Sequence, residues 1–332
     1  MALRIKILGT LVVIVFVAWS AFWWFAASTV ETASADAITK AGKRGIAIAC
    51  DNKTVRGWPF RMTLICDSLG VETKDIKVSA NGLRAVALIY NPSHLIIEAD
   101  SPIDLSGQTL KDPVHAEWKS AQASFQLSSN IIDKASMAFS DITLESAAFR
   151  PLKDPVAELL EVHMKRADNP TDLDVALTSR MIKTALGSTS LPEFDLDIVG
   201  MISKGAHLLL GQNRQFLEQV KAGEVSVALD RARITIGAAR VELSGDFALA
   251  QNGHLNATPR IAIANVQALS AELARIPGID MSRVEPFLAL FSGFGEKTEI
   301  DGAPANAVTL TIRDGRIKAG LFPLGRLKPV AF

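Results

Sequence analysis

Hydrophobic residues follow two different patterns along this chain, one near the N-terminus and one over most of the remainder. Residues 7–30 include no charged residue, and residues 11–17 are aliphatic or aromatic without interruption. A helix rises ~1.5 Å per residue, so about 20 apolar residues cross the ~30 Å hydrocarbon layer of a bilayer. The first pattern therefore predicts a transmembrane anchor over residues 7–30.

The charges on either side of this stretch predict its orientation. Arg4 and Lys6 precede it, whereas the first charges after it are those of Glu31 and Asp36. Cationic residues favour the cytoplasmic side, so residues 1–6 are expected in the cytoplasm. Tryptophan favours the membrane interface, and three stand toward the far end of the stretch: Trp19, Trp23 and Trp24. We expect a single-pass inner-membrane protein of a Gram-negative bacterium, with its body in the periplasm.

A cleaved signal peptide is the alternative for this segment, because residues 33–35 read Ala-Ser-Ala, a small-x-small cleavage pattern. The apolar run is longer than the 7–15 residues typical of a signal peptide, which favours a retained anchor. Residues 31–45 are expected to extend the helix beyond the membrane and to form a linker. Gly42 and Gly45 are expected to end that helix.

The second pattern is an alternation of apolar and polar residues that begins at Ile46 and recurs to the end of the chain. Alternation with period two indicates strands with one apolar and one polar face. Strands are expected near residues 46–48, 62–65, 76–78, 83–90, 95–98, 160–164, 173–177, 194–198, 225–229, 234–236, 241–249, 261–263 and 308–312. Turn-forming pairs are expected to separate strands at 81–82, 91–92, 252–253 and 314–315.

These patterns predict a mainly β (α+β) fold. An N-terminal transmembrane helix would be followed by an extended, curved antiparallel sheet in two similar halves, residues 46–190 and 191–332. Helical spacing appears near residues 208–220, 266–276 and 283–291, with Asn265 as an N-cap of the second helix. We expect these helices to cap a face of the sheet, with contact to a membrane or a partner as the alternative.

Composition narrows the function classes. The 332 residues include 35 Lys+Arg and 35 Asp+Glu, so no net charge points to nucleic acid. The only cysteines, Cys50 and Cys66, are expected to form a disulfide in an oxidising periplasm, with two buried free thiols as the alternative. No histidine lies within forty residues downstream of Cys50, which argues against a metal site there.

No motif for catalysis stands out. The chain has no phosphate-binding Gly-Lys-Ser/Thr loop, and Ser292-Gly293-Phe294-Gly295 does not fit a nucleophile elbow or a dinucleotide turn. The histidines are scattered singly, and Asp195 and Asp197 on one strand face are expected on a solvated sheet surface. We therefore predict no catalytic residue, no metal, no cofactor and no enzymatic activity.

One short segment has an unusual composition. Arg56, Gly57, Trp58, Pro59, Phe60 and Arg61 lie between the two cysteines and combine two aromatic residues with two cations. The aromatic rings could enter a hydrophobic groove or the bilayer surface while the arginines pair with phosphate headgroups. Alternatively, the rings plug the end of the sheet and the arginines stay in water. We take this segment as the candidate binding loop.

The same segment carries a resemblance to a known family. The features concerned are Cys50, Gly-Trp-Pro-Phe-Arg at 57–61, Cys66, Val-Glu-Leu-Ser-Gly at 241–245, Asn-Gly at 252–253, Arg-Asp-Gly-Arg at 313–316 and Phe-Pro-Leu-Gly at 322–325. With the N-terminal anchor, they resemble DUF2125, a family of uncharacterised single-pass envelope proteins of alphaproteobacteria. More distantly, the chain is similar to AsmA-type envelope proteins, whose curved sheets form grooves for phospholipid. The resemblance implies topology and fold but no catalytic residue.

Two functions follow as hypotheses from the sequence. The first is a non-enzymatic envelope protein that binds phospholipid or another apolar ligand on a curved sheet. The second is an envelope scaffold or assembly factor that binds a protein partner through a sheet edge or the loop around Trp58. The expected partners are therefore the inner membrane, with phospholipid or an envelope protein, and not nucleic acid.

Overall fold

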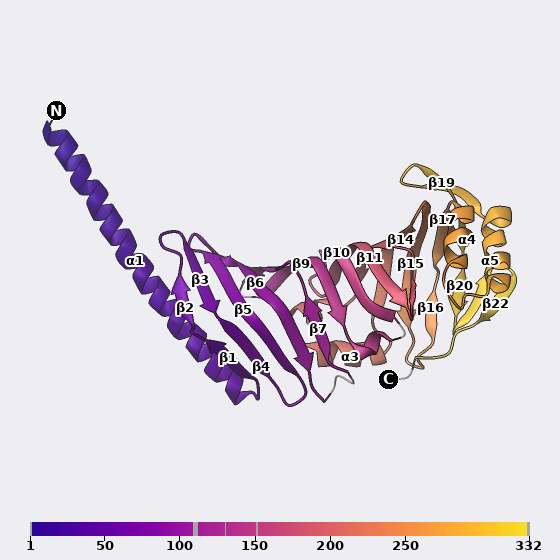
Figure 1. The fold of residues 1–332 in the computed structure, drawn as a ribbon, viewed down its shortest axis with the longest axis horizontal. Coiled ribbons are helices and arrows are strands. Elements are labelled where there is room, and N and C mark those ends of the chain that lie inside the picture. The colour runs from indigo at the N-terminus through magenta and orange to yellow at the C-terminus, as the bar shows by residue number, and fades with distance from the viewer. Residues whose placement is uncertain (1, 109–111, 130, 151, 331–332) are drawn as a thin grey trace. The chain divides into compact units, whose positions relative to one another are not determined.

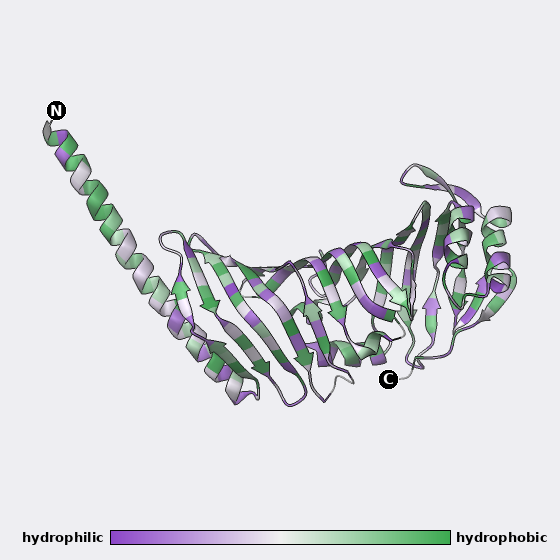
Figure 2. Cartoon of the chain, viewed as in Figure 1, coloured by the Kyte–Doolittle hydropathy of each residue, from purple (hydrophilic) through white to green (hydrophobic). Residues whose placement is uncertain are grey.

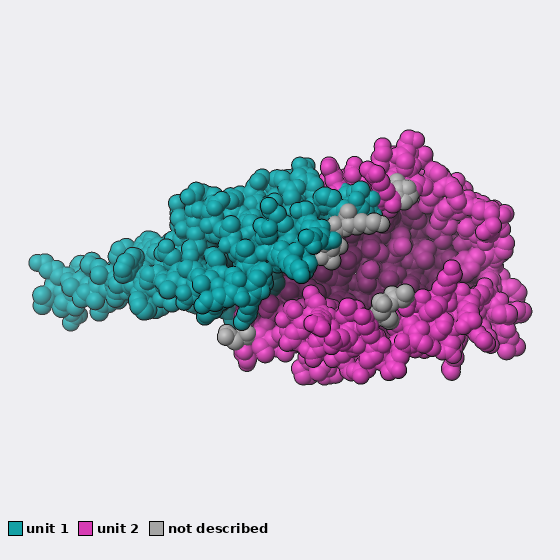
Figure 3. All heavy atoms as spheres, turned by 90° about the horizontal axis from the view of Figure 1, so that it is seen from below, with its two compact units in different colours: residues 1–126, 146–148 teal, residues 127–145, 149–332 magenta. Residues whose placement is uncertain are grey.

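The computed structural model describes residues 2–108, 112–129, 131–150 and 152–330. Its residues group into two compact units, coloured separately in Figure 3. Unit 1 comprises residues 1–126 and 146–148, and unit 2 comprises residues 127–145 and 149–332. Antiparallel strands dominate both units, so the predicted mainly β fold with an N-terminal helix and a few smaller helices is confirmed.

The N-terminal helix α1 runs without a break from Ala2 to Lys43 (Figure 1). It includes the predicted anchor, and it is the one helix among the described residues that is long and apolar enough to cross a membrane. The helix ends at Lys43, between Gly42 and Gly45. Gly45 adopts a φ of 81°, and the Ile46 N–H donates to the Ala41 carbonyl, which closes the helix end.

Unit 1 also contains an antiparallel sheet. Its strands are β1 (Ala47–Asp51), β2 (Thr54–Arg56), β3 (Arg61–Cys66), β4 (Ser68–Glu72), β5 (Lys77–Leu88), β6 (Asn91–Ser106), β7 (Val114–Glu117) and β8 (Ser120–Ser128), which ends just beyond it. The long strand β5 organises this sheet, because β4 and β3 pair with its two ends along one edge and β6 pairs along the other. β1 extends the sheet beyond β4, and β2 extends it beyond β3.

The expected turn at Asn81-Gly82 is wrong, because both residues lie inside β5. The Asn81 side chain donates to the Ser101 carbonyl at 3.1 Å across the strand pair. Gly82 has an Asp100 carboxylate oxygen 2.5 Å from the position a Cβ would occupy. The missing side chain thus makes room for the carboxylate, which accepts from Arg84. This glycine serves close packing between strands and not a turn.

The two cysteines lie at disulfide distance, as expected from the sequence. Cys50 on β1 and Cys66 on β3 are bonded, with 5.2 Å between their Cα atoms. β2 and the candidate binding loop lie within the segment that the bond closes. The bond therefore limits how far this segment can separate from β1 when the sheet opens.

Unit 2 is built on a larger antiparallel sheet. Its strands are β9 (Ile131–Glu145), β10 (Leu152–Arg166), β11 (Leu173–Leu186), β12 (Thr189–Ser190), β13 (Phe194–Ile202), β14 (Ser226–Ile236), β15 (Ala239–Leu249), β16 (Leu255–Ala257), β17 (Arg260–Ala264), β18 (Glu296–Ile300), β19 (Ala303–Thr309), β20 (Thr311–Arg313), β21 (Arg316–Ala319) and β22 (Phe322–Arg326). Hydrogen bonding connects β9, β10, β11, β13, β14, β15, β17, β19 and β18 in that order. β16, β20, β21 and β22 continue from β15.

The helices of unit 2 depart from expectation in one place. The predicted helix at 208–220 is two helices, α2 (Ala206–Leu209) and α3 (Asn213–Lys221), because Gly211 between them adopts a φ of 67°. The other two form as expected, as α4 (Val266–Ala274) and α5 (Met281–Phe294). The Asn265 side chain caps α4 by accepting from the Ala268 N–H. A 3-10 turn, η1 (Ala147–Phe149), follows β9.

The two compact units meet near residue 126, whereas β11 and β13 pair directly on either side of residue 190, where the sequence suggested two halves of one sheet. The expected strand at 308–312 is interrupted at Leu310, whose N–H donates to the Pro259 carbonyl. The Asp314-Gly315 turn does form, and both residues have positive φ.

One face of the unit 2 sheet is polar. Cross-strand neighbours on this face include Thr178, Asp197, Arg233 and Glu242. The Asp197 carboxylate accepts from Arg180 at 2.7 Å and from Thr178 at 3.2 Å. Burial raises the pKa of this carboxyl, but the hydrogen bond from Arg180 and its positive charge together lower the pKa by more. The pKa of Asp197 therefore lies below its usual value.

Breaking the Cys50–Cys66 bond should destabilise unit 1. In the chain-entropy model, closing a segment with a sequence separation of 16 contributes about 3 kcal/mol. We expect the Cys50→Ser, Cys66→Ser double variant to lose about that much free energy of unfolding in denaturant titrations of the detergent-solubilised chain. A reductant should shift the midpoint of the wild type and leave the double variant unchanged. Equal midpoints for the two proteins would contradict the prediction.

The Asp197→Asn variant should show a pH-dependent loss of stability. Because the folded-state pKa is depressed, the ionised carboxylate contributes stability above its unfolded-state pKa. We expect a loss of about 0.5–1 kcal/mol at pH 7, since water partly screens the ion pair. The difference from the wild type should shrink as the pH falls below about 4. Thermal melts at pH 3 to 7 measure this, with Asp230→Asn at an exposed carboxylate of β14 as the control.

Candidate functional site

The candidate binding loop forms the tip of a hairpin between β2 and β3. Arg56 ends β2 opposite Thr63, and Arg61 begins β3. Gly57 adopts a φ of 115°, and a Cβ there would lie 2.7 Å from the Arg61 carbonyl oxygen. Only glycine fits this tight return of the chain. The structure thus brings the residues singled out in the sequence together at one end of unit 1.

The loop packs against α1, a contact that the sequence did not reveal (Figure 1). The Trp19 indole N–H donates to the Pro59 carbonyl at 2.9 Å, and the Trp23 indole N–H donates to the Arg61 carbonyl at 3.1 Å. Both tryptophans therefore bind the loop with their only polar group.

Aromatic rings extend this contact along α1 toward its N-terminus. The Trp58 ring lies edge-on to Phe16, with 5.4 Å between the ring centroids. The Phe60 ring lies 6.1 Å from the Trp19 ring. Trp58 nevertheless remains 47% exposed and Phe60 60% exposed. Neither ring is buried at the end of the sheet, which the plug interpretation would require.

A neighbouring turn is bonded to the same loop. The Ile89 N–H, in the turn between β5 and β6, donates to the Phe60 carbonyl at 3.0 Å. Tyr90 follows in that turn and is 73% exposed. We call the loop 56–61 and the turn 89–90 together the aromatic edge. Its exposed aromatic residues are Trp58, Phe60 and Tyr90.

Lys53 makes a second connection between the sheet and α1. Its ammonium donates to the Glu31 carbonyl at 3.2 Å and to the Ser34 hydroxyl at 3.1 Å. This contact lies beyond the uncharged stretch of α1, where the helix is expected to leave the membrane. The aromatic edge lies on the opposite side of that point, against the uncharged stretch.

A second candidate site lies on unit 2, where the strand register aligns apolar side chains on one sheet face. Directly paired residues share a face, so successive pairs trace a row across the sheet. We call it the apolar row, and its members are Met137, Val162, Leu177, Ile198, Ala232, Leu243, Ile261 and Val308. The alternating bands of Figure 2 show the same separation of apolar and polar residues along the strands.

Helices cover one end of this face. Leu269 of α4 and Leu288 and Phe291 of α5 form a buried core with Ile236 and Ile263. The row members Ile261 and Val308 pack against that core. All eight members of the row, including Ile261 and Val308, are half-buried. Part of the apolar surface of this face therefore remains accessible along the whole row.

An apolar cavity lies next to the covered end of the row. It has a volume of about 620 Å³ and is lined by Val308, Leu290 and Phe294 of α5, and Phe322 and Leu324 of β22. Phe294 is 84% exposed and Phe322 71% exposed, so the cavity opens to the surface. Pockets of this size and lining commonly hold small apolar ligands.

A basic cavity of about 640 Å³ adjoins the hairpin formed by β21 and β22. Gly320 lines both cavities. The basic one is also lined by four cations and one carboxylate: Arg313, Arg316, Lys318, Arg326 and Asp314. Arg316 pairs across the strands with both Arg313 and Arg326. None of these four cations forms an ion pair with a described residue. Like charges on opposed positions repel, so an anion bound here would stabilise this hairpin.

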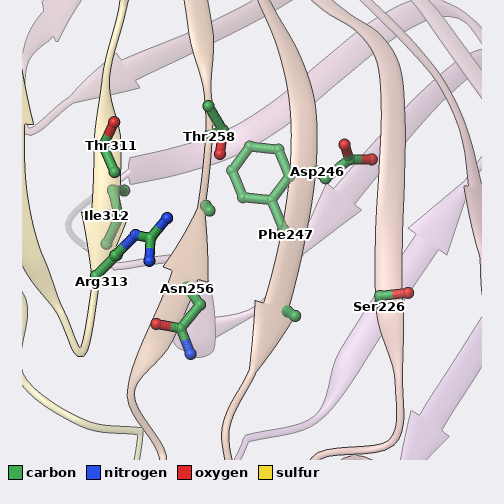
Figure 4. A pocket seen from close by; sticks show the side chains of 10 residues that line it. Ser226, Asp246, Phe247, Asn256, Thr258, Thr311, Ile312 and Arg313 are labelled. Carbon is green, nitrogen blue, oxygen red and sulfur yellow. The ribbon is translucent and has the colours of Figure 1, made fainter.

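A further pocket of about 420 Å³ lies where β14, β15, β16 and β20 meet (Figure 4). The Asp246 carboxylate and the Arg313 guanidinium lie on opposite sides of the Phe247 ring. The remaining polar lining consists of Asn256, Thr258 and other neutral groups. Asp195 and Asp197 are elsewhere on β13, and they accept from the Met181 N–H and from Arg180.

Metal-ligating side chains do not gather within the parts of the chain that the structure describes: no group of three or more His, Cys, Asp or Glu could share an ion. Cys50 and Cys66 are taken up by their mutual bond. The sites with recognisable chemistry are thus the aromatic edge, the apolar row with its cavity, and the basic cavity. The aromatic edge and the apolar row suit apolar groups, and the basic cavity suits an anionic group.

Comparison with known proteins adds the family. A family model described as an uncharacterised protein conserved in bacteria, DUF2125, matches residues 23–328. No curated protein and no solved structure matches the chain. The match begins at Trp23 in α1, includes the hairpin loop and the strands of both units, and ends just after β22. It confirms the resemblance carried by the short motifs, and the chain belongs to the DUF2125 family.

Proposed function

We propose that this protein is a single-pass inner-membrane protein whose β-sheets lie on the periplasmic side of the membrane, and that unit 2 binds phospholipid acyl chains along the apolar row without chemical conversion. The alignment of eight half-buried apolar side chains on one face of the sheet carries this proposal. The helix α1 supports it, because its length and apolar composition would keep the units beside a source of lipid.

The energetics of apolar surface favour such a ligand. Removing apolar surface from water contributes about 25 cal/mol per Å², and monomeric proteins rarely leave large contiguous apolar patches uncovered. A hydrocarbon chain is flexible and has no polar group that needs a partner. It can therefore lie along a row such as Val162, Leu177 and Ile198 without leaving unpaired hydrogen-bonding groups.

The basic cavity supports a ligand with an anionic headgroup. Arg313, Arg316, Lys318 and Arg326 face one cavity, and arginine forms paired hydrogen bonds with phosphate oxygens. The adjoining apolar cavity would accept the nearby hydrocarbon. Anionic phospholipid combines both chemistries in one molecule.

Photoactivatable lipid tests the proposal on the full-length chain in vesicles. Phosphatidylglycerol with a diazirine in its acyl chain should label peptides from β10, β11 and β13, with α1 as the internal positive control. Replacing Leu177 by Gln should lower labelling of β11 about fivefold, the factor expected from losing about 1 kcal/mol of apolar contact. Thr178→Gln, on the opposite face of the same strand, should leave labelling unchanged.

Two outcomes would refute lipid binding by unit 2. The first is labelling confined to α1, with no adduct on β10, β11 or β13. The second is equal labelling of the Leu177→Gln and Thr178→Gln variants at the same melting temperature. A protein adduct at these strands in cell membranes would instead support the envelope scaffold, which binds a protein partner.

A further inference from the structure

We infer that the aromatic edge of unit 1 is embedded in the membrane leaflet nearest to that unit, with Trp58, Phe60 and Tyr90 among the acyl chains. The inference does not depend on lipid binding by unit 2. It depends on where the aromatic edge meets α1 and on how the backbone of the loop is hydrogen-bonded.

The position of the contact along α1 is the first observation. Phe16, which packs on Trp58, is ten residues beyond Lys6, or about 15 Å along the helix axis. It is fifteen residues before Glu31, or about 22 Å from the next charge. A helix that crosses a ~30 Å hydrocarbon layer with this stretch holds Phe16 well inside the layer. Any group in contact with Phe16 lies at a similar depth.

The hydrogen bonding of the loop is the second observation. Irregular backbone is tolerated at membrane depth only where protein groups satisfy its polar atoms. The carbonyls of Pro59 and Arg61 accept from the indoles of Trp19 and Trp23. The carbonyls of Gly57 and Phe60 accept from the Arg61 and Ile89 N–H groups. Pro59 itself has no N–H to satisfy, so the tip presents few polar backbone groups.

The exposure of the side chains is the third observation. Trp58, Phe60 and Tyr90 are 47%, 60% and 73% exposed at one end of the sheet. In water this apolar surface would be unfavourable, whereas aromatic rings are favoured in and near the bilayer. Arg56 and Arg61 flank the rings at the bases of the loop, where long side chains can extend to lipid phosphates.

The alternative occupant of this edge is a protein. A protein partner would have to reach Trp58 beside Phe16, and that part of α1 is surrounded by lipid in a spanning helix. The membrane therefore fits the location of the edge better than a soluble partner does. The opposite end of β5 offers a comparison, because Ile76 in the β4–β5 turn is an exposed apolar residue there.

Site-specific photocrosslinking distinguishes these cases in the full-length chain. We expect p-benzoylphenylalanine at Phe60 or Tyr90 to form adducts with phospholipid in membranes. The same residue at Ile76, roughly 40 Å away along β5, should form none. Leu11, an exposed residue in the uncharged stretch of α1, serves as the positive control.

Several outcomes would overturn the inference. A discrete protein adduct at Phe60 and Tyr90 in place of lipid would identify a partner surface. Equal lipid adducts at Ile76 and Tyr90 would show that lipid contacts both ends of β5 and that the aromatic edge is not specifically inserted in the membrane. Absence of lipid adducts at Leu11 would show that this part of α1 does not lie in the membrane. Each variant is checked by the mobility of the oxidised Cys50–Cys66 form, so a misfolded protein is recognised before the crosslinks are compared.

Discussion

Two indole N–H groups attach the first sheet to the long N-terminal helix. Trp19 and Trp23 donate to carbonyls of a loop that would otherwise carry unpaired acceptors beside an apolar helix. An unpaired polar group away from water costs about as much as a lost hydrogen bond, so this pairing allows an irregular loop to lie there. The position of β2, β3 and the β5–β6 turn beside α1 follows from this constraint.

The same requirement explains the surroundings of the loop. Gly57 permits the tight return, and the Arg61 N–H closes it onto the Gly57 carbonyl. The Cys50–Cys66 bond joins the strands at the base of the segment, and Lys53 binds α1 farther along. Covalent and hydrogen bonds thus position a small set of exposed aromatic rings that the sheet itself does not cover.

The arrangement of unit 2 follows from a different constraint: successive side chains along a strand point to opposite faces of the sheet. Its polar face pairs charges, as in Arg180 with Asp197 and Arg233 with Glu242. Its other face collects one apolar residue from each of eight strands into a row, and α4 and α5 pack on this face beside Ile261 and Val308. A sheet with one satisfied polar face and one partly covered apolar face suits a membrane-anchored protein that meets amphipathic molecules.

Local patterns in the sequence determined the elements. The uncharged stretch of residues 7–30 predicts α1, alternation predicts most strands, and Asn265 marks the start of α4, because periodicity and capping act over a few residues. Only the tertiary structure decided that Asn81-Gly82 continues a strand, that β11 and β13 pair across residue 190, and that Trp19 and Trp23 bind the loop around Trp58. These features depend on register and on contacts between residues about forty positions apart, which no local pattern encodes.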